Sequence, residues 1–216
     1  MDSLAMYSNM NFPAPLAALG FLAACAATVL CGCTVLAALF LGKRRIAVVT
    51  IGVVAPCAVL YLGLLFGFSF SSRDISLARG QEKYFCEIDC HLAYSIVDVK
   101  QDLAAASRRY VITLRTRFDE TTISSRRPKG RPLTPSPRTM QLVDASGAHY
   151  LPEAIVGTPL LTPLIPGQSY TTQVIFQMPP HATDPKLLIQ TTPQWPDHIV
   201  IGDENSWLHG KTYLAL

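Results

Sequence analysis

The sequence predicts a transmembrane hairpin of two helices followed by an antiparallel β-sandwich. The first observation is a pair of apolar runs, Pro15–Gly42 and Ile46–Phe70, which contain no Asp, Glu, Lys, Arg or His. At 28 and 25 residues, each run exceeds the ~20 apolar residues that cross a hydrocarbon core of ~30 Å. The second observation is the basic turn Lys43–Arg45 between the runs. The third is the period-two pattern of much of the remaining chain, which is typical of strands with one buried face.

The charges around the two runs predict which side of the membrane each part occupies. Short loops rich in Lys and Arg stay in the cytoplasm, so the turn at Lys43–Arg45 is expected there. Residues 1–14 contain no Lys or Arg and are expected to form a short extracytoplasmic tail, with residues 71–216 also outside. Basic residues that closely follow the second run, beginning with Arg73, partly offset this bias. The predicted location is an inner (plasma) membrane crossed twice, and the resemblance described below implies that it is the membrane of a bacterium.

Composition divides the chain into the hairpin at 15–70, a short polar linker at 71–81 and one domain at 82–216. The domain is long enough to bury a core of its own. It contains thirteen basic and thirteen acidic residues, so it is neutral although the whole chain has a net charge of +3. A neutral domain gives no electrostatic support for a nucleic-acid partner, and none is predicted.

Alternating apolar and polar residues predict the strands of the domain. The alternation is clearest over Tyr110–Asp119 and Tyr170–Met178, where one face is apolar and the other polar. Within Leu92–Val99 the apolar phase shifts near Ile96-Val97, which predicts a bulge or a strand buried on both faces. Further short strands are expected at Met140–Val143, His149–Leu151, Lys186–Gln190, His198–Ile201 and Tyr213–Leu216, with turns at Asp144–Gly147 and Pro166–Ser169.

Prolines and turn residues recur between these segments, as they do in antiparallel β-sandwiches. About seven strands fit the domain, so the predicted fold is all-β and immunoglobulin-like. No segment after residue 81 shows a sustained helical period, although Val99–Ser107 fits one or two helical turns. Trp207 is interpreted as a residue that closes one end of the sandwich, with a partner-binding Trp as the other interpretation.

The densest group of reactive side chains is Tyr84–His91, which contains Cys86, Cys90 and His91. Thiolate and imidazole groups at this spacing are ligands for copper or zinc. Two spans followed by a β-sandwich with Cys-x-x-x-Cys also resemble the layout of cytochrome c oxidase subunit II. In that family a His follows four residues after the second Cys, and then a Met, whereas position 94 here is Tyr and no Met follows nearby. A metal-binding or redox module using Cys86, Cys90 and His91 is therefore the alternative hypothesis.

The preferred interpretation of the two cysteines is a Cys86–Cys90 disulfide. An extracytoplasmic compartment is oxidising, and paired cysteines there usually form a bridge. Such a bridge closes a very small loop and stiffens a turn more than it stabilises the fold. No cofactor is predicted on this interpretation.

A basic segment, Ser124–Arg138, interrupts the strand pattern. Its interpretations are a long mobile loop between two strands, or a basic arm that contacts anionic lipid headgroups or an acidic partner. Its basic residues are Arg126, Arg127, Lys129, Arg131 and Arg138.

Three motifs of the domain occur in a fixed order, at Asp144–Tyr150, Leu164–Ser169 and Val174–Pro179. Read as D-x-x-G-x-x-Y, L-x-P-G-x-S and V-x-F-x-x-P, they resemble uncharacterised immunoglobulin-like domains of bacterial membrane-anchored and secreted proteins. The resemblance spans roughly residues 84–190 and implies an extracytoplasmic β-sandwich without assigned chemistry. It carries no functional residue over to this chain.

The sequence predicts a non-catalytic role. It contains no Gly-x-Ser-x-Gly elbow, no His-Glu-x-x-His pair and no glycine loop of the phosphate-binding kind. The expected function is an interaction or scaffolding module of the cell envelope, whose partners are the lipid bilayer and another envelope protein.

Overall fold

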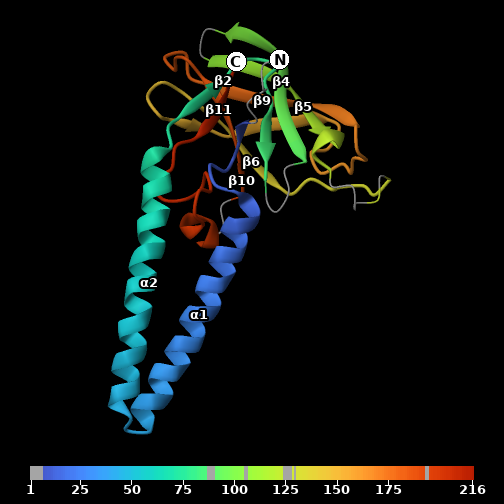
Figure 1. The fold of residues 1–216 in the computed structure, drawn as a ribbon. Helices are drawn as coiled ribbons and strands as arrows, with labels where there is room; N and C mark the ends of the chain where they lie inside the picture. The colour runs from blue at the N-terminus through green and yellow to red at the C-terminus, as the bar shows by residue number, and fades with distance from the viewer. Residues whose placement is uncertain (1–6, 87–90, 105–106, 124–127, 129, 193–194) are drawn as a thin grey trace.

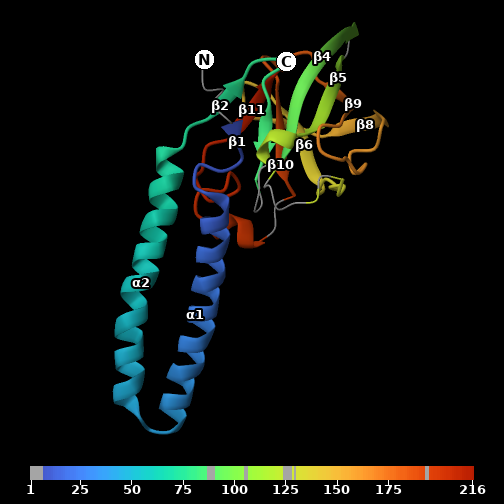
Figure 2. The same ribbon diagram turned by 45° about the vertical axis from the view of Figure 1, so that its right-hand side comes forward.

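The computed structural model describes residues 7–86, 91–104, 107–123, 128, 130–192 and 195–216. Two long helices stand side by side below a body of two β-sheets (Figure 1). Seen from a second direction, the helices still run side by side and the sheets still lie at one end of them (Figure 2). The short turn between the helices therefore lies at the end far from the sheets.

Helices α1 (Ala14–Phe40) and α2 (Arg44–Ser71) form the antiparallel pair. Pro15 occupies the first turn of α1, where its missing N–H is not needed, and Gly42 turns the chain with a φ of +67°. Both helices are long and apolar enough to cross a membrane, and most of their surface is not covered by protein. The two predicted apolar runs are thus confirmed as helices.

The strands form two sheets that face each other as in a sandwich. The first sheet has the order β1-β3-β4-β5-β9-β8, and the second has the order β2-β11-β10-β6-β7. The strand bounds are β1 (Tyr7–Ser8), β2 (Ile75–Leu77), β3 (Lys83–Phe85), β4 (Leu92–Ala104), β5 (Ser107–Phe118), β6 (Arg138–Val143), β7 (His149–Tyr150), β8 (Pro152–Gly157), β9 (Ser169–Met178), β10 (Lys186–Thr191) and β11 (Thr212–Ala215).

The prediction of wholly antiparallel sheets is wrong, because the sheets are mixed. Strand β1 pairs in parallel with β3, and β2 pairs in parallel with β11. Parallel neighbours need a long connection, which is the helical pair for β1 and β3 and most of the domain for β2 and β11. Both added strands flank the helices, so they join the sheets from outside the 82–216 segment. The predicted immunoglobulin-like fold is not confirmed by this arrangement.

The core lies between the facing sheets. The alternation over β5 and β9 points Ile112, Leu114 and Phe118 of one strand and Val174 and Phe176 of the other into this core. Complete burial of such side chains removes their apolar surface from water and drives the sheets together.

Several local predictions are confirmed. The pairing of β4 with β5 shifts register between Ile96 and Asp98, which is the bulge predicted there. The turn between β6 and β7 also forms, with the Asp144 carboxylate accepting a 2.9 Å hydrogen bond from the Ser146 amide and with Gly147 at a φ of +81°.

Other local predictions are wrong. The described residues of Val99–Ser107 form no helical turn, because residues 99–104 continue β4 and pair with β5, which begins at Ser107. The predicted strand His198–Ile201 does not form: its first two residues end a short 3₁₀ helix, η2 (Trp195–Ile199), and its last two lie in a bend and a turn. Pro196, the second residue of η2, fixes φ at about −65°, which suits the first turn of a helix. Trp207 does not close the sandwich, since 48% of its surface is exposed.

Candidate functional site

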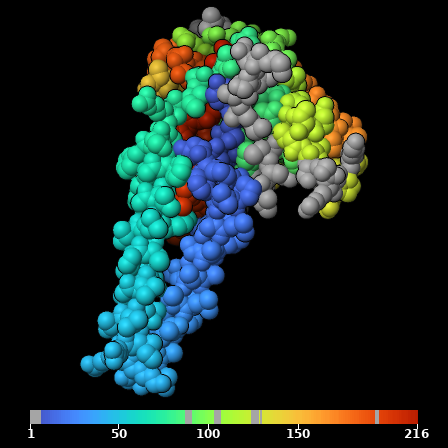
Figure 3. All heavy atoms as spheres, viewed as in Figure 1, coloured from blue at the N-terminus to red at the C-terminus, as the bar shows by residue number. Residues whose placement is uncertain are grey.

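The segment 195–211, here called the junction loop, forms hydrogen bonds with residues next to both helices and with the sandwich. It lies below the sheets and between the sandwich ends of the two helices (Figures 1 and 2). In the space-filling view, atoms near the C-terminus, in red, are visible between α1 and α2 (Figure 3). The junction loop therefore lies where the helices meet the sandwich.

On the α1 side, the junction loop binds the residues that precede the helix. The Asn11 amide donates to the Gly202 carbonyl at 3.0 Å, and the Glu204 amide donates to the Asn9 carbonyl at 2.8 Å. The Asn9 side chain is buried and its Oδ1 accepts a 2.7 Å hydrogen bond from the Cys86 amide. The predicted N-terminal tail is thus a structural part of the sandwich.

On the α2 side, the junction loop binds both the helix and the residues that follow it. The Tyr61 hydroxyl donates to the Ile199 carbonyl at 2.7 Å. The Gly210 amide donates to Ser72 Oγ at 2.7 Å, and the Lys211 amide donates to Asp74 Oδ1 at 2.8 Å. The predicted linker is therefore held by the domain that it connects.

Two glycines allow this close approach. A Cβ atom at Gly202 would lie 2.5 Å from the Phe12 Cβ, and one at Gly210 would lie 2.4 Å from the Arg73 carbonyl carbon. Gly202 also has a φ of +74°, which other residues adopt only at an energetic cost. Each glycine thus lets the junction loop touch the backbone next to one helix.

A buried ion pair joins the junction loop to both sheets. Lys83 Nζ lies 2.8 Å from Glu204 Oε2, and it also donates to the carbonyls of Ile189 at 2.6 Å and Thr212 at 2.8 Å. Glu204 Oε1 accepts a 2.7 Å hydrogen bond from the Thr212 amide. Burial lowers the pKa of Lys83, and the nearby Glu204 carboxylate opposes this effect. The partners of Lys83 thus lie on β10, on β11 and in the junction loop.

Asp203, beside this pair, has an unusual acidity. Burial raises its pKa from 3.8 to about 6, although a hydrogen bond from the Asn205 amide favours the charged form. The negative charges of Asp197 and Glu204 add to the increase, and Lys211 opposes it. The charge of the Asp203 carboxylate therefore changes in the mildly acidic range.

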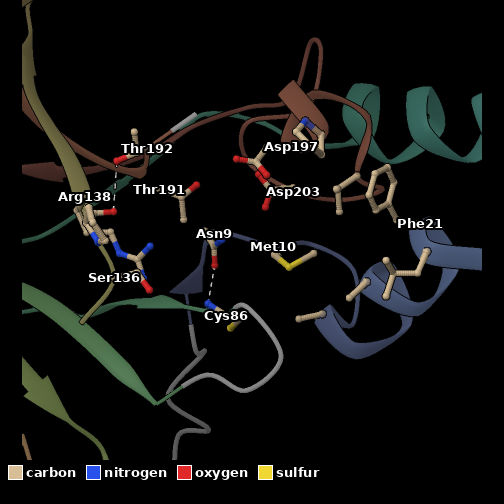
Figure 4. A pocket seen from close by; sticks show the side chains of 16 residues that line it. Asn9, Met10, Phe21, Cys86, Ser136, Arg138, Thr191, Thr192, Asp197 and Asp203 are labelled. Atoms are coloured by element: carbon tan, nitrogen blue, oxygen red, sulfur yellow. Dashed lines mark hydrogen bonds between the residues drawn. The ribbon is translucent and has the colours of Figure 1, made fainter. Parts of the chain in front are cut away.

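A cavity of about 710 Å³ lies between the start of α1 and the sandwich. Its apolar wall comes from α1, and its polar wall comes from β6 and the junction loop. Figure 4 shows Arg138 at one end and Phe21 at the other, with Asp197 and Asp203 between them in this view. The wall residues include Ala18, Phe21 and Leu22 on α1 and Arg138, Asp197 and Asp203 on the opposite side.

The predicted cysteine and histidine cluster is only partly described. Cys86 follows β3 and is buried, whereas Cys90 lies outside the described residues, so the disulfide stays a prediction. His91 is buried, its Nδ1 lies 2.7 Å from Thr122 Oγ1, and its ring stacks on Phe118 at 5.6 Å. Within the described ranges, no three His, Cys, Asp or Glu side chains are grouped as metal ligands.

Among the described residues of the basic segment, the end at Ser136, Pro137 and Arg138 lines the cavity. Arg126, Arg127 and Lys129 lie outside the described residues, and Arg131 is exposed. The Arg138 guanidinium lies over the Phe85 ring at 4.4 Å and lines the cavity. Position Arg138 therefore belongs to the sandwich rather than to a free basic arm.

A second polar cluster lies at the beginning of β3. Arg117 binds the Glu82 carboxylate through two hydrogen bonds of 2.9 and 2.7 Å and contacts Asp119 at 2.9 Å. Burial alone would raise the pKa of Asp119, but hydrogen bonds from Tyr84, Thr121 and Arg117 lower it well below its usual value. The paired charges hold the end of β5 beside β3 across the intervening strand.

Sequence reasoning missed both the buried ion pair and the cavity. One signal for Lys83 was present, because alternation along β3 places it on the same face as the buried Phe85. Glu204 and Asp203 lie in an irregular segment, where no periodic pattern indicates burial.

Comparison with protein-family models, curated proteins and solved structures finds no match to this chain. The resemblance to immunoglobulin-like domains therefore rests on the three motifs and stays a prediction.

Replacing Gly202 by Ala tests the close approach at the junction. We expect Gly202→Ala to destabilise the full chain by about 1–3 kcal/mol, because the new Cβ meets Phe12 and the backbone is strained. Thermal unfolding in detergent measures the change. Gly147→Ala is the matched control, since its φ is +81° but nothing lies within 4 Å of its Cβ position. Equal losses for the two variants would contradict the junction contact.

Replacing Asp203 by Asn tests its raised pKa. The folded-state pKa exceeds the unfolded value, so the stability that Asp203 contributes is complete below about pH 4 and is lost as pH rises through about 6. Asp203→Asn removes this loss and is expected to be more stable at pH 7.5, by an amount on the order of 1–3 kcal/mol. The advantage should disappear at pH 4.

Asp144→Asn is the control of opposite sign. Hydrogen bonds, the largest from Ser146, lower the pKa of Asp144 to about 2. This variant should be less stable than the unchanged chain at pH 7.5, with a difference that shrinks as pH falls through the acidic range. If Asp203→Asn shows the same pH trend as Asp144→Asn, the assignment of the raised pKa is wrong.

Proposed function

We propose that this chain is an interaction or scaffolding module on the extracytoplasmic side of a bacterial inner membrane. The two apolar helices are its membrane spans, and the basic turn Lys43–Arg45 lies at the end of the helices far from the sandwich. Because basic loops stay in the cytoplasm, this arrangement supports an external sandwich. The membrane is then crossed twice, and the sandwich rests on its outer surface.

The sandwich is presented in a fixed orientation. Strand β2 follows α2 after three residues and joins the second sheet, while β1 precedes α1 and joins the first. The junction loop binds the flanks of both helices. A partner would therefore meet the sandwich at a defined height and angle above the bilayer.

The observation that carries the proposal is the open edge of the first sheet at β8. Sheet order places β8 at the opposite edge from β1, which leads directly into α1. Ile155 and Val156 of this strand are 48% and 50% exposed, and Leu151 just before it is 69% exposed. An open edge with apolar side chains pairs readily with an extended segment of another chain. The proposed partner is an envelope protein that adds a strand there.

An oxidising location also favours the Cys86–Cys90 disulfide. The free cysteines of the described chain are all on the apolar helices, and Cys86 is not among them. In this proposal the bridge stiffens the turn after β3 and has no redox role.

A photo-crosslinking amino acid placed at Ile155 tests the proposed edge. In native membranes we expect a discrete crosslinked product at Ile155, because the partner strand lies against β8. The same amino acid at Val97, an equally exposed apolar site on β4, is the matched control and should give no such product. Ile155→Lys together with Val156→Lys should reduce capture of that partner by about tenfold or more, since charged residues block edge pairing. Equal products from Ile155 and Val97 would contradict the proposal.

A further inference from the structure

The cavity at the junction has one wall that belongs to a membrane span. Ala18, Phe21 and Leu22 line it from the first part of α1. The Leu22 side chain is 61% exposed, so it faces outward as well as into the cavity. The cavity is therefore open on the side of α1 to the medium that surrounds this helix.

The depth of this wall follows from helix length, if α1 and α2 span the membrane as in the proposed function. Phe21 lies 19 residues before Phe40, the end of α1 next to the basic turn, which is about 28 Å at about 1.5 Å per residue. Since the hydrocarbon core is ~30 Å thick, Phe21 lies close to its outer boundary. Ala18 lies just beyond that boundary, in the headgroup region.

The other helix gives a similar depth, about 4 Å closer to the basic turn. Tyr61 lies 16 residues after Arg45, which is about 24 Å along α2. Its hydroxyl binds the Ile199 carbonyl, so η2 lies near the outer boundary as well. Trp195, at the other end of η2, is 72% exposed. Tryptophan concentrates at membrane interfaces, which agrees with this placement.

The opposite wall carries both signs of charge. Arg138 supplies a guanidinium at one end, and Asp197 and Asp203 supply two carboxylates nearer the α1 wall (Figure 4). Guanidinium groups bind phosphate, and carboxylates bind ammonium. The cavity thus offers a site for an anion, a site for a cation and an apolar surface next to each other.

We propose that this cavity binds one phospholipid of the outer leaflet whose zwitterionic headgroup carries a primary amine. The phosphate lies at Arg138, the ammonium lies at Asp197 and Asp203, and the acyl chains follow Phe21 and Leu22 into the bilayer. An anionic lipid without an amine would bring its phosphate to Arg138 but would bring no ammonium group to Asp197 and Asp203. A water-soluble phosphate compound would leave the α1 wall without an apolar partner.

Lipid retention by the full chain tests this proposal. The protein is reconstituted into nanodiscs of phosphatidylethanolamine and phosphatidylglycerol in equal amounts, re-extracted in mild detergent and examined by native mass spectrometry. We expect one phosphatidylethanolamine per chain, retained at least about tenfold more than phosphatidylglycerol. Asp203→Asn, which is expected to fold at least as stably at neutral pH, should reduce this preference toward one.

A second test fills the cavity with a large side chain placed on its apolar wall. Ala18→Trp should abolish retention of either lipid, whereas Ala26→Trp, on the same helix but outside the cavity, should retain lipid like the unchanged chain. Equal retention of the two lipids by the unchanged chain would overturn the proposal, as would full retention by Ala18→Trp.

These outcomes are separate from a failure of the proposed function. If the chain does not span a membrane, alkaline carbonate will release it from membrane preparations, whatever lipid it retains. If it spans a membrane and lacks the lipid site, it will resist carbonate and show no preference between the two lipids.

Discussion

The ion pair between Lys83 and Glu204 connects the parts of this molecule that are far apart in sequence. Removing both charges from water is costly, and such a pair is favourable only when the remaining donors and acceptors are also satisfied. The Lys83 ammonium meets this condition, since its contacts are the Glu204 carboxylate and the carbonyls of Ile189 and Thr212. Glu204 in turn binds the Thr212 amide and, through its own amide, Asn9. The pair therefore connects both sheets to the junction loop, and the backbone amide of Glu204 adds Asn9, the residue that follows β1.

The same contacts of the junction loop bear on the cavity, whose polar wall comes from this loop and from β6. The junction loop must satisfy its backbone groups without joining a sheet, and it does so with residues next to both helices. The cavity remains where the loop, β6 and α1 do not pack fully against one another. In the proposed orientation, this imperfectly packed corner lies at the outer boundary of the bilayer, where an amphiphile can fill it.

The parts of the fold that could be predicted from sequence are those with local causes. Long apolar runs predict the two helices. Alternation of apolar and polar residues predicts β5 and β9, and the shift of that alternation predicts the bulge at Val97, because burial of one strand face imposes a period of two. The parallel strands β1 and β2 could not be found this way, since each is too short to show a period and pairs with a distant segment. The junction loop has the same property: Gly202 and Gly210 matter through contacts with Phe12 and Arg73, more than one hundred residues away.

Hydrogen exchange measured by mass spectrometry on the full chain in nanodiscs tests the role of the ion pair most directly. Lys83→Met leaves the Glu204 carboxylate buried without its cation, so exchange should become faster in the junction loop and in β1 while the β4–β5 hairpin stays protected. Lys186→Met is the control, because the ion pair that Lys186 forms among the described residues is with the exposed Asp184 at 3.7 Å, and its loss should leave both regions unchanged. Protection of the junction loop that is identical in Lys83→Met and in the unchanged chain would contradict the central role of this pair.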